Sequence, residues 1–199
     1  MWATPDDVPP AIGASDCGVH SETVRTDRLV LAPMSADVVR SILRRDWSTT
    51  RRRIGCDFPL EWRQDGWRWL EPQADKGEQD DRYVAWGTRL AFAREPDVLT
   101  EGHAAVLAEV GFHGPPDTEG WAEIGYRVVA RYRRQGLAEE AAGALLRWAP
   151  AHGAVGIKAS VRPSNSASIG LLRKLGFTVT GRYEHDTLGK QAILHLRLQ

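Results

Sequence analysis

Cysteine, lysine and long apolar segments are all scarce in this chain of 199 residues. The two cysteines, Cys17 and Cys56, are too few for a disulfide framework or a thiolate metal site, and a reducing, cytoplasmic location is expected. No apolar run approaches the roughly 18 residues that would predict a membrane-spanning helix. Acidic and basic residues balance at 26 each. No global field therefore favours nucleic acid or an anionic membrane, and any anion site must be local.

The length fits one domain with an extension. Residues 1–22 contain prolines, acids and glycines but no apolar stretch, so they are expected to form a flexible N-terminal tail without a signal peptide. Residues 23–199 are expected to form a single domain. Their patterns predict a strand, helices, three strands, a helix, a strand, a helix and two strands. That order favours a mixed α/β fold with antiparallel hairpins and interleaved helices.

The clearest helix signals lie in the second half of the chain. Leu137, Ala141, Leu145 and Trp148 share one helical face, which indicates a helix from about Gln135 to Pro150. Residues 48–82 instead predict short helices and a mobile loop. Strands are expected over 23–34, 83–95, 104–114, 121–130, 155–161, 178–183 and 191–199, and a further helix over 165–176 between the Asn165 N-cap and Gly176.

The segment Arg133–Ala138, RRQGLA, joins positive charge to a helix start. A helix start presents backbone N–H groups without intrahelical partners, and these attract anions. Gly136 would let an oxygen ligand approach the backbone, and Arg133 and Arg134 could neutralise phosphate oxygens. The segment matches neither a Walker loop nor a Rossmann turn. Considered alone, the segment favours a solvated basic turn before a helix over an anion site.

Four motifs together resemble the GCN5-related N-acetyltransferases (GNAT), in particular their RimJ/RimL-like branch. Arg133-x-x-Gly136-x-Ala138 resembles the signature that binds the pyrophosphate of coenzyme A. The others are EIGYRV (123–128), NSASIGLLRKLGF (165–177) and TDRLVLAPM (26–34), in which Ala32 stands where an arginine is usual. The resemblance runs from about Thr23 to the C-terminus and is weakest over residues 45–85.

The resemblance implies a GNAT-type sheet with a V-shaped splay between its two central strands, and acetyl-CoA or another acyl-CoA as co-substrate. The acceptor would be a primary amine of a peptide or protein N-terminus or of a small molecule. Val128 and Val129 would offer backbone to the pantetheine arm, although both also fit a plain core. The residues expected at the coenzyme are these two with Arg133, Arg134, Gln135, Gly136, Leu137, Ala138, Asn165 and Ser168.

Acetyl transfer by direct attack needs a deprotonated amine and a departing thiolate. Glu123 is the candidate base, because strand alternation places it on one face with Gly125 and Arg127. A surface glutamate paired with an arginine is the alternative interpretation. Ser168 is the candidate acid by resemblance, with Tyr126 and Tyr183 as substitutes, although its hydroxyl could simply bond to backbone. Both cysteines lie outside the motifs, so no covalent nucleophile is expected.

Several alternatives stay open at this stage. The tryptophans Trp47, Trp62, Trp67 and Trp69 are expected to be mostly core, but they lie where this family builds its acceptor pocket. Acids in Glu71–Asp81 would suit a polycationic drug, as in an aminoglycoside-type resistance enzyme. A non-catalytic acyl-CoA sensor would not depend on Glu123. His103 and His113 lack metal-ligand spacing, so no metal is expected. The acyl group and the choice between monomer and homodimer are not determined.

Overall fold

The computed structural model describes residues 22–65, 67–95, 99–100 and 102–198. The expected tail, residues 1–22, therefore lies outside the described residues apart from Glu22. One sheet of eight strands organises the rest, in the order β1-β2-β3-β4-β5-β6-β8-β7. Every neighbouring pair in it is antiparallel except β5–β6. The strands are β1 Val24–Arg25, β2 Leu29–Pro33, β3 Thr88–Ala93, β4 Val106–Phe112, β5 Trp121–Val128, β6 Gly156–Val161, β7 Thr178–His185 and β8 Gly189–Arg197.

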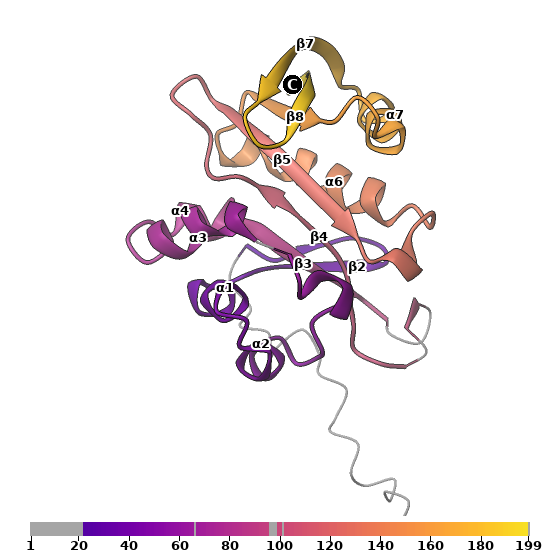
Figure 1. Cartoon of the computed structure of the whole chain (residues 1–199). Coiled ribbons are helices and arrows are strands. Elements are labelled where there is room, and N and C mark those ends of the chain that lie inside the picture. Colours follow the sequence, from indigo (N-terminus) through magenta and orange to yellow (C-terminus); the bar gives the residue numbers. More distant parts are fainter. Residues whose placement is uncertain (1–21, 66, 96–98, 101, 199) are drawn as a thin grey trace, which may run out of the picture.

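Helices cover both faces of the sheet. The main α-helices are α1 Ala36–Leu43, α2 Trp47–Ile54, α3 Glu71–Lys76, α4 Arg82–Ala85, α6 Leu137–Trp148 and α7 Ser166–Lys174. Short 3-10 turns are η2 Leu60–Trp62, η3 Arg68–Leu70, η4 Ala130–Tyr132 and η5 Pro150–His152. Figure 1 shows α6 lying along β4 and β5, while α1 and α2 lie at the far end of the molecule from β7 and β8.

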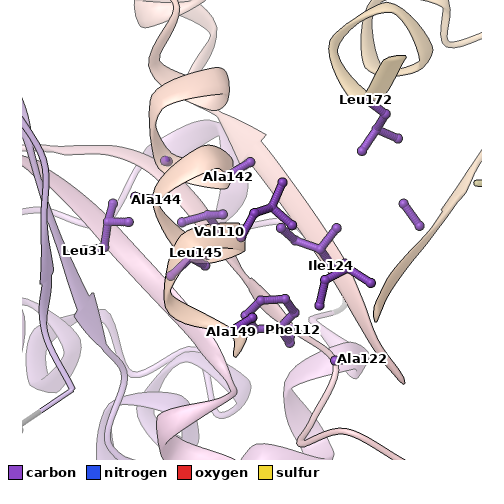
Figure 2. Packing of buried hydrophobic residues seen from close by; sticks show 14 of the residues in the cluster. Leu31, Val110, Phe112, Ala122, Ile124, Ala142, Ala144, Leu145, Ala149 and Leu172 are labelled. Carbon is purple, nitrogen blue, oxygen red and sulfur yellow. The ribbon is translucent and has the colours of Figure 1, made fainter. Parts of the chain in front are cut away.

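Two hydrophobic clusters fill the space between helices and sheet. The larger joins α6 to β4 and β5, and Figure 2 shows Ala142 and Leu145 of α6 pointing toward Val110, Phe112 and Ile124. Small alanines let α6 approach the strands closely, which fixes the position of its N-terminus. The second cluster lies on the opposite face, where Met34, Val39, Phe58, Trp62, Trp67 and Leu90 belong to it. Both of these buried tryptophans are core residues, as expected.

The predicted order of elements is confirmed in outline, with two local corrections. The strand expected over 83–95 begins only at Thr88, because residues 82–85 turn as α4. The expected strand over 23–34 is divided into β1 and β2, with Thr26 accepting from the N–H of Leu29 between them. Ser35, Asn165 and Gly176 occupy the predicted capping and left-handed positions. Within the described ranges, no helix is long and apolar enough to cross a membrane.

Candidate active site

The two central strands separate to form a V. β5 and β6 pair only through Trp121–Glu123 and Gly156–Lys158. Beyond Glu123, β5 stays paired with β4 as far as Val128, while β6 stays paired with β8 as far as Val161. The strands therefore diverge because each remains bound to its other neighbour. This divergence confirms the predicted splay, and Glu123 is the last residue of β5 before it.

A groove of about 540 Å³ runs between the end of β5 and the starts of α6 and α7. It brings together eight of the ten residues that the sequence predicted to contact the coenzyme. Val129 and Gln135 are the exceptions. The lining residues are Tyr126, Arg127, Val128, Tyr132, Arg133, Arg134, Gly136, Leu137, Ala138, Glu139, Asn165, Ala167, Ser168 and Leu171.

The loop before α6 has the geometry of an anion cradle. Arg134 and Gly136 both have positive φ, at 62° and 78°, so the chain turns sharply into the helix. Gly136 is the N-cap and supplies no side chain, and no side chain in the described part of the protein caps this helix start. The first-turn N–H groups therefore face the groove without a side-chain acceptor. Arg133 and Arg134 are both exposed beside them. These features fit a bound pyrophosphate.

The first strand pair braces this loop from behind. Arg28 donates from Nε to Glu140 Oε2 at 2.6 Å and from Nη1 to the carbonyl of Gln135 at 3.0 Å. Thr26 Oγ1 and the Arg28 N–H both donate to Glu140 Oε1. Burial opposes ionisation of Glu140, but these hydrogen bonds outweigh it and lower the pKa of the carboxyl. The TDRL motif was noticed in the sequence, whereas its partner Glu140 was not.

The two predicted contacts outside the groove have their backbone groups already bonded. Val129 is buried; its N–H donates to Leu107 O at 2.9 Å and its carbonyl accepts from Tyr132 N. Gln135 directs its carbonyl to Arg28. Val128 does line the groove, and its carbonyl accepts from Arg133 Nε at 3.0 Å. A ligand that donates to this carbonyl would share it with Arg133 or displace that side chain.

The start of α7 forms the opposite wall. Asn165 Oδ1 accepts from the Ser168 N–H at 3.1 Å, so Asn165 caps its own helix while lining the groove. Tyr126 reaches across from β5 and donates its hydroxyl to the Ser168 carbonyl at 3.3 Å. Burial raises the pKa of Tyr126. Both candidate acids, Ser168 and Tyr126, thus lie in the groove, while Tyr183 lies on β7 and does not line it.

Glu123 lies at the vertex of the splay between two basic side chains. Its side chain is 25% exposed, and its Oε2 lies 3.9 Å from Nδ1 of His113, which follows directly after β4. On the other side its partner in β6 is Lys158, whose Nζ lies 3.9 Å from Asp117. Glu123 makes no ion pair with an arginine among the described residues, which is the alternative that the sequence left open.

A buried charge cluster on the same face of the sheet was missed by the sequence analysis. Arg127 pairs with Asp65 and lies 3.1 Å from Glu109 Oε1 through its Nε. The guanidinium also stacks over the rings of Trp62, Trp67 and Trp69. Glu109 is 7% exposed, and burial raises its pKa to about 7 against the opposing charge of Arg127. The available signal was a lone acid within the apolar strand VLAEVGF.

The tryptophan-rich segment is connected to the groove through this cluster. Asp65 comes from the loop after η2, and Glu61 Oε1 accepts from the Ala130 N–H at 2.8 Å, immediately before the cradle. The acidic stretch Glu71–Asp81 forms α3 and the turn after it, and none of its residues lines the groove. Within the described residues, no group of three or more His, Cys, Asp or Glu side chains could hold a metal.

Comparison with known proteins now identifies the family. A model of the acetyltransferase (GNAT) domain matches residues 28–178. The chain therefore belongs to the GNAT acetyltransferases, which take their acyl group from an acyl-coenzyme A.

Individual relatives agree with this assignment. The uncharacterised N-acetyltransferase YjdG of Bacillus subtilis is 33% identical over 97 residues, which is 49% of this chain and 45% of that protein. The match thus spans less than half of the relative's length. RimL, a ribosomal L7/L12 alpha-N-protein acetyltransferase in complex with coenzyme A, superposes with a TM-score of 0.60 at 13% identity, covering 88% of this chain and 98% of that chain. The ribosomal-protein-S5-alanine acetyltransferase of Vibrio fischeri superposes with a TM-score of 0.60 at 12% sequence identity, and the match covers 88% of this chain and 96% of that chain. Identities this low show a shared fold.

Proposed function

We propose that this protein transfers the acetyl group of acetyl-CoA, or the acyl group of another acyl-CoA, to a primary amine by direct attack. The observation that carries the proposal is the position of Glu123 at the vertex of the splay, three residues before Tyr126, where the lining of the groove begins on the same strand; Glu123 itself does not line the groove. A coenzyme lying in that groove with its pyrophosphate at Gly136 would direct its thioester toward the vertex. The relevant carboxylate and the acyl donor would then meet at one place.

The amine would lose its proton to Glu123, directly or through a water, because an ammonium has no lone pair to attack with. The C–N bond then forms at the thioester carbon and the C–S bond breaks. Ser168 is proposed to protonate the departing thiolate, with Tyr126 as its substitute, since both line the groove. The Tyr126 hydroxyl already donates its proton to the Ser168 carbonyl, which favours Ser168 as the general acid.

The cradle residues Arg133, Arg134, Gly136, Leu137 and Ala138 are proposed to hold the pyrophosphate, and Val128, Asn165 and Ser168 the pantetheine arm. Gln135 contributes by fixing the loop, because Arg28 holds its carbonyl. Val129 packs in the second core cluster at the end of β5, and we propose that it does not contact the ligand.

A peptide or protein N-terminus is the acceptor class suggested by structural neighbours, since RimL is described as acting on the amino terminus of ribosomal L7/L12. A small-molecule amine remains the second acceptor class. No acid of Glu71–Asp81 lines the groove, so nothing here favours an aminoglycoside-type polycation over these two.

The test is a comparison of Glu123→Gln with Glu184→Gln, an exposed control on β7. Acetyl-CoA and succinyl-CoA are incubated with peptides bearing free N-termini and with small amines, and thiol release and product mass are measured. Coenzyme affinity is measured separately by calorimetry. We expect Glu123→Gln to lose about 100-fold in kcat while binding the coenzyme normally. An unchanged rate would remove Glu123 as the base; binding with no turnover in any wild-type reaction would favour an acyl-CoA sensor.

A further inference from the structure

His113 lies directly opposite Glu123 across the β4–β5 pair. The His113 N–H donates to the Glu123 carbonyl at 2.9 Å, which fixes the two residues as cross-strand neighbours. Their side chains project from the same face, where His113 Nδ1 lies 3.9 Å from Glu123 Oε2. That separation is longer than a direct hydrogen bond, but one side-chain rotation or one bridging water closes it. The imidazole is therefore within proton-transfer reach of the proposed base.

Gly125 creates the space that the imidazole occupies. A Cβ on Gly125 would lie 3.0 Å from Nε2 of His113, closer than most real contacts. Phe112, immediately before His113, is buried in the larger core cluster and anchors this end of β4. The histidine thus lies flat over β5 because the strand carries no side chain at that position, between Glu123 and Arg127.

The two side chains also form a path from the site to water. The Glu123 side chain is 25% exposed, whereas that of His113 is 47% exposed. A carboxylate that has accepted a proton from an amine must release it before the next turnover, and a half-exposed imidazole beside it is suited to receive the proton. The crevice on the other side of His113, between Trp69 and Tyr83, has room for only about one water, at about 10 Å³, so it is not an acceptor pocket.

The other charged side chains around His113 and Glu123 already contact other partners. Lys158 faces Glu123 from β6 but lies near Asp117, and Arg127 on the same face pairs with Asp65 and Glu109. From α3 and α4, Lys76 donates to the hydroxyl of Tyr83, which lines the crevice next to His113. His113 is a half-exposed titratable side chain that lies 3.9 Å from Glu123 and forms no other ion pair among the described residues.

We infer that His113 is a proton-relay residue that returns the proton from Glu123 to solvent during each turnover. This inference rests on the proposed role of Glu123 as base. The proton leaves the acceptor ammonium for Glu123 Oε2 and then passes to His113 Nδ1. The imidazolium so formed releases its Nε2 proton to water, which leaves Glu123 ionised and His113 as the neutral Nδ1–H tautomer. Proton exchange with water at the two ring nitrogens then restores the starting tautomer. No oxidant or further reactant is required, and His113 acts through Glu123 rather than on the substrate.

Two readouts test the relay, with His103→Gln as a matched control because His103 is an exposed histidine that precedes β4, whereas His113 follows it, and does not line the groove. The first needs no acceptor: the imidazole of His113 is titrated by NMR in the wild-type protein and in Glu123→Gln. A relay requires the two side chains to be coupled, so replacing Glu123 should change the titration curve of His113, whereas the curve of His103 should stay the same. An unchanged titration would overturn the inference regardless of whether an acceptor is known.

The second readout is turnover of His113→Ala with acetyl-CoA and a peptide that the wild-type enzyme acetylates. We expect kcat to fall by about tenfold and to recover as free imidazole is added, while coenzyme affinity stays unchanged. A loss that imidazole does not restore at any pH, or no loss at all, would contradict the relay. If instead the titration shows coupling but Glu123→Gln retains full turnover, the proposed base fails and the His113–Glu123 contact is structural.

Discussion

Arg28 and Glu140 lie 112 residues apart in the chain and are joined by a 2.6 Å contact between Nε and Oε2. The same guanidinium holds the carbonyl of Gln135, so the entrance to the second strand fixes the loop that precedes α6. The backbone conformation of this loop matters because its N–H groups bind an anion only when they all point toward the same position. This contact therefore links the N-terminal TDRL motif to the groove that we propose holds the coenzyme.

The first prediction concerns this brace. Glu140→Gln should lower the free energy of unfolding by about 1–2 kcal/mol and weaken coenzyme A binding several-fold, because Arg28 then loses its charged partner and the loop its support. Thermal denaturation and calorimetry measure the two effects. Glu139→Gln removes a charge from the same turn, but from an exposed pair with Lys174, and should change stability by less than about 0.5 kcal/mol. Equal losses of stability in the two variants would contradict the brace.

The second prediction concerns Gly136, whose φ is +78°. Gly136→Ala forces a Cβ into the left-handed region and places a methyl where an oxygen ligand would approach. Stability should fall by about 1–2 kcal/mol, and coenzyme affinity should fall as well. Gly170→Ala is the control, because it lies in α7 with nothing within 4 Å of a new Cβ, and it should stabilise by about 0.5–1 kcal/mol. Full coenzyme affinity in Gly136→Ala would show that no ligand approaches the backbone there.

The third prediction concerns Glu109, whose pKa burial raises to about 7. Between about pH 4.5 and pH 7, the Glu109 carboxyl is ionised in the unfolded chain but stays protonated in the folded protein. Stability should therefore fall as pH rises through that window, by at most roughly 3 kcal/mol, and become level with respect to this group above it. Glu109→Gln cannot titrate, so its unfolding free energy relative to the wild type should rise with pH over the same window. Denaturant unfolding at pH 5, 6, 7 and 8 measures the difference; parallel curves would mean that Glu109 is ionised throughout.

Local chemistry explains why much of the fold was readable from the sequence. The helix at 137–148 is predictable because its apolar spacing and its flanking Gly136 and Pro150 all act within a few residues. The same is true of the Asn165 cap and of the left-handed Gly176. Tyr83–Ala85 was misassigned because a short apolar stretch fits a strand or a helical turn equally well, and packing decided between them.

The candidate site likewise has features that were predictable from the sequence and features that were not. Sequence by itself determined the helix start at Gly136 that the proposed anion cradle uses, because Gly136 and the helix start lie within six residues and their backbone geometry is local. It also determined the alternation that places Glu123, Gly125 and Arg127 on one face. Only the tertiary structure decided which residues surround them: Glu140 behind the cradle, His113 beside Glu123, and Glu109 with Asp65 around Arg127. Their partners come from elements 10 to 112 residues away, and such pairings are fixed by strand register and by burial of the two cores, which no local pattern contains.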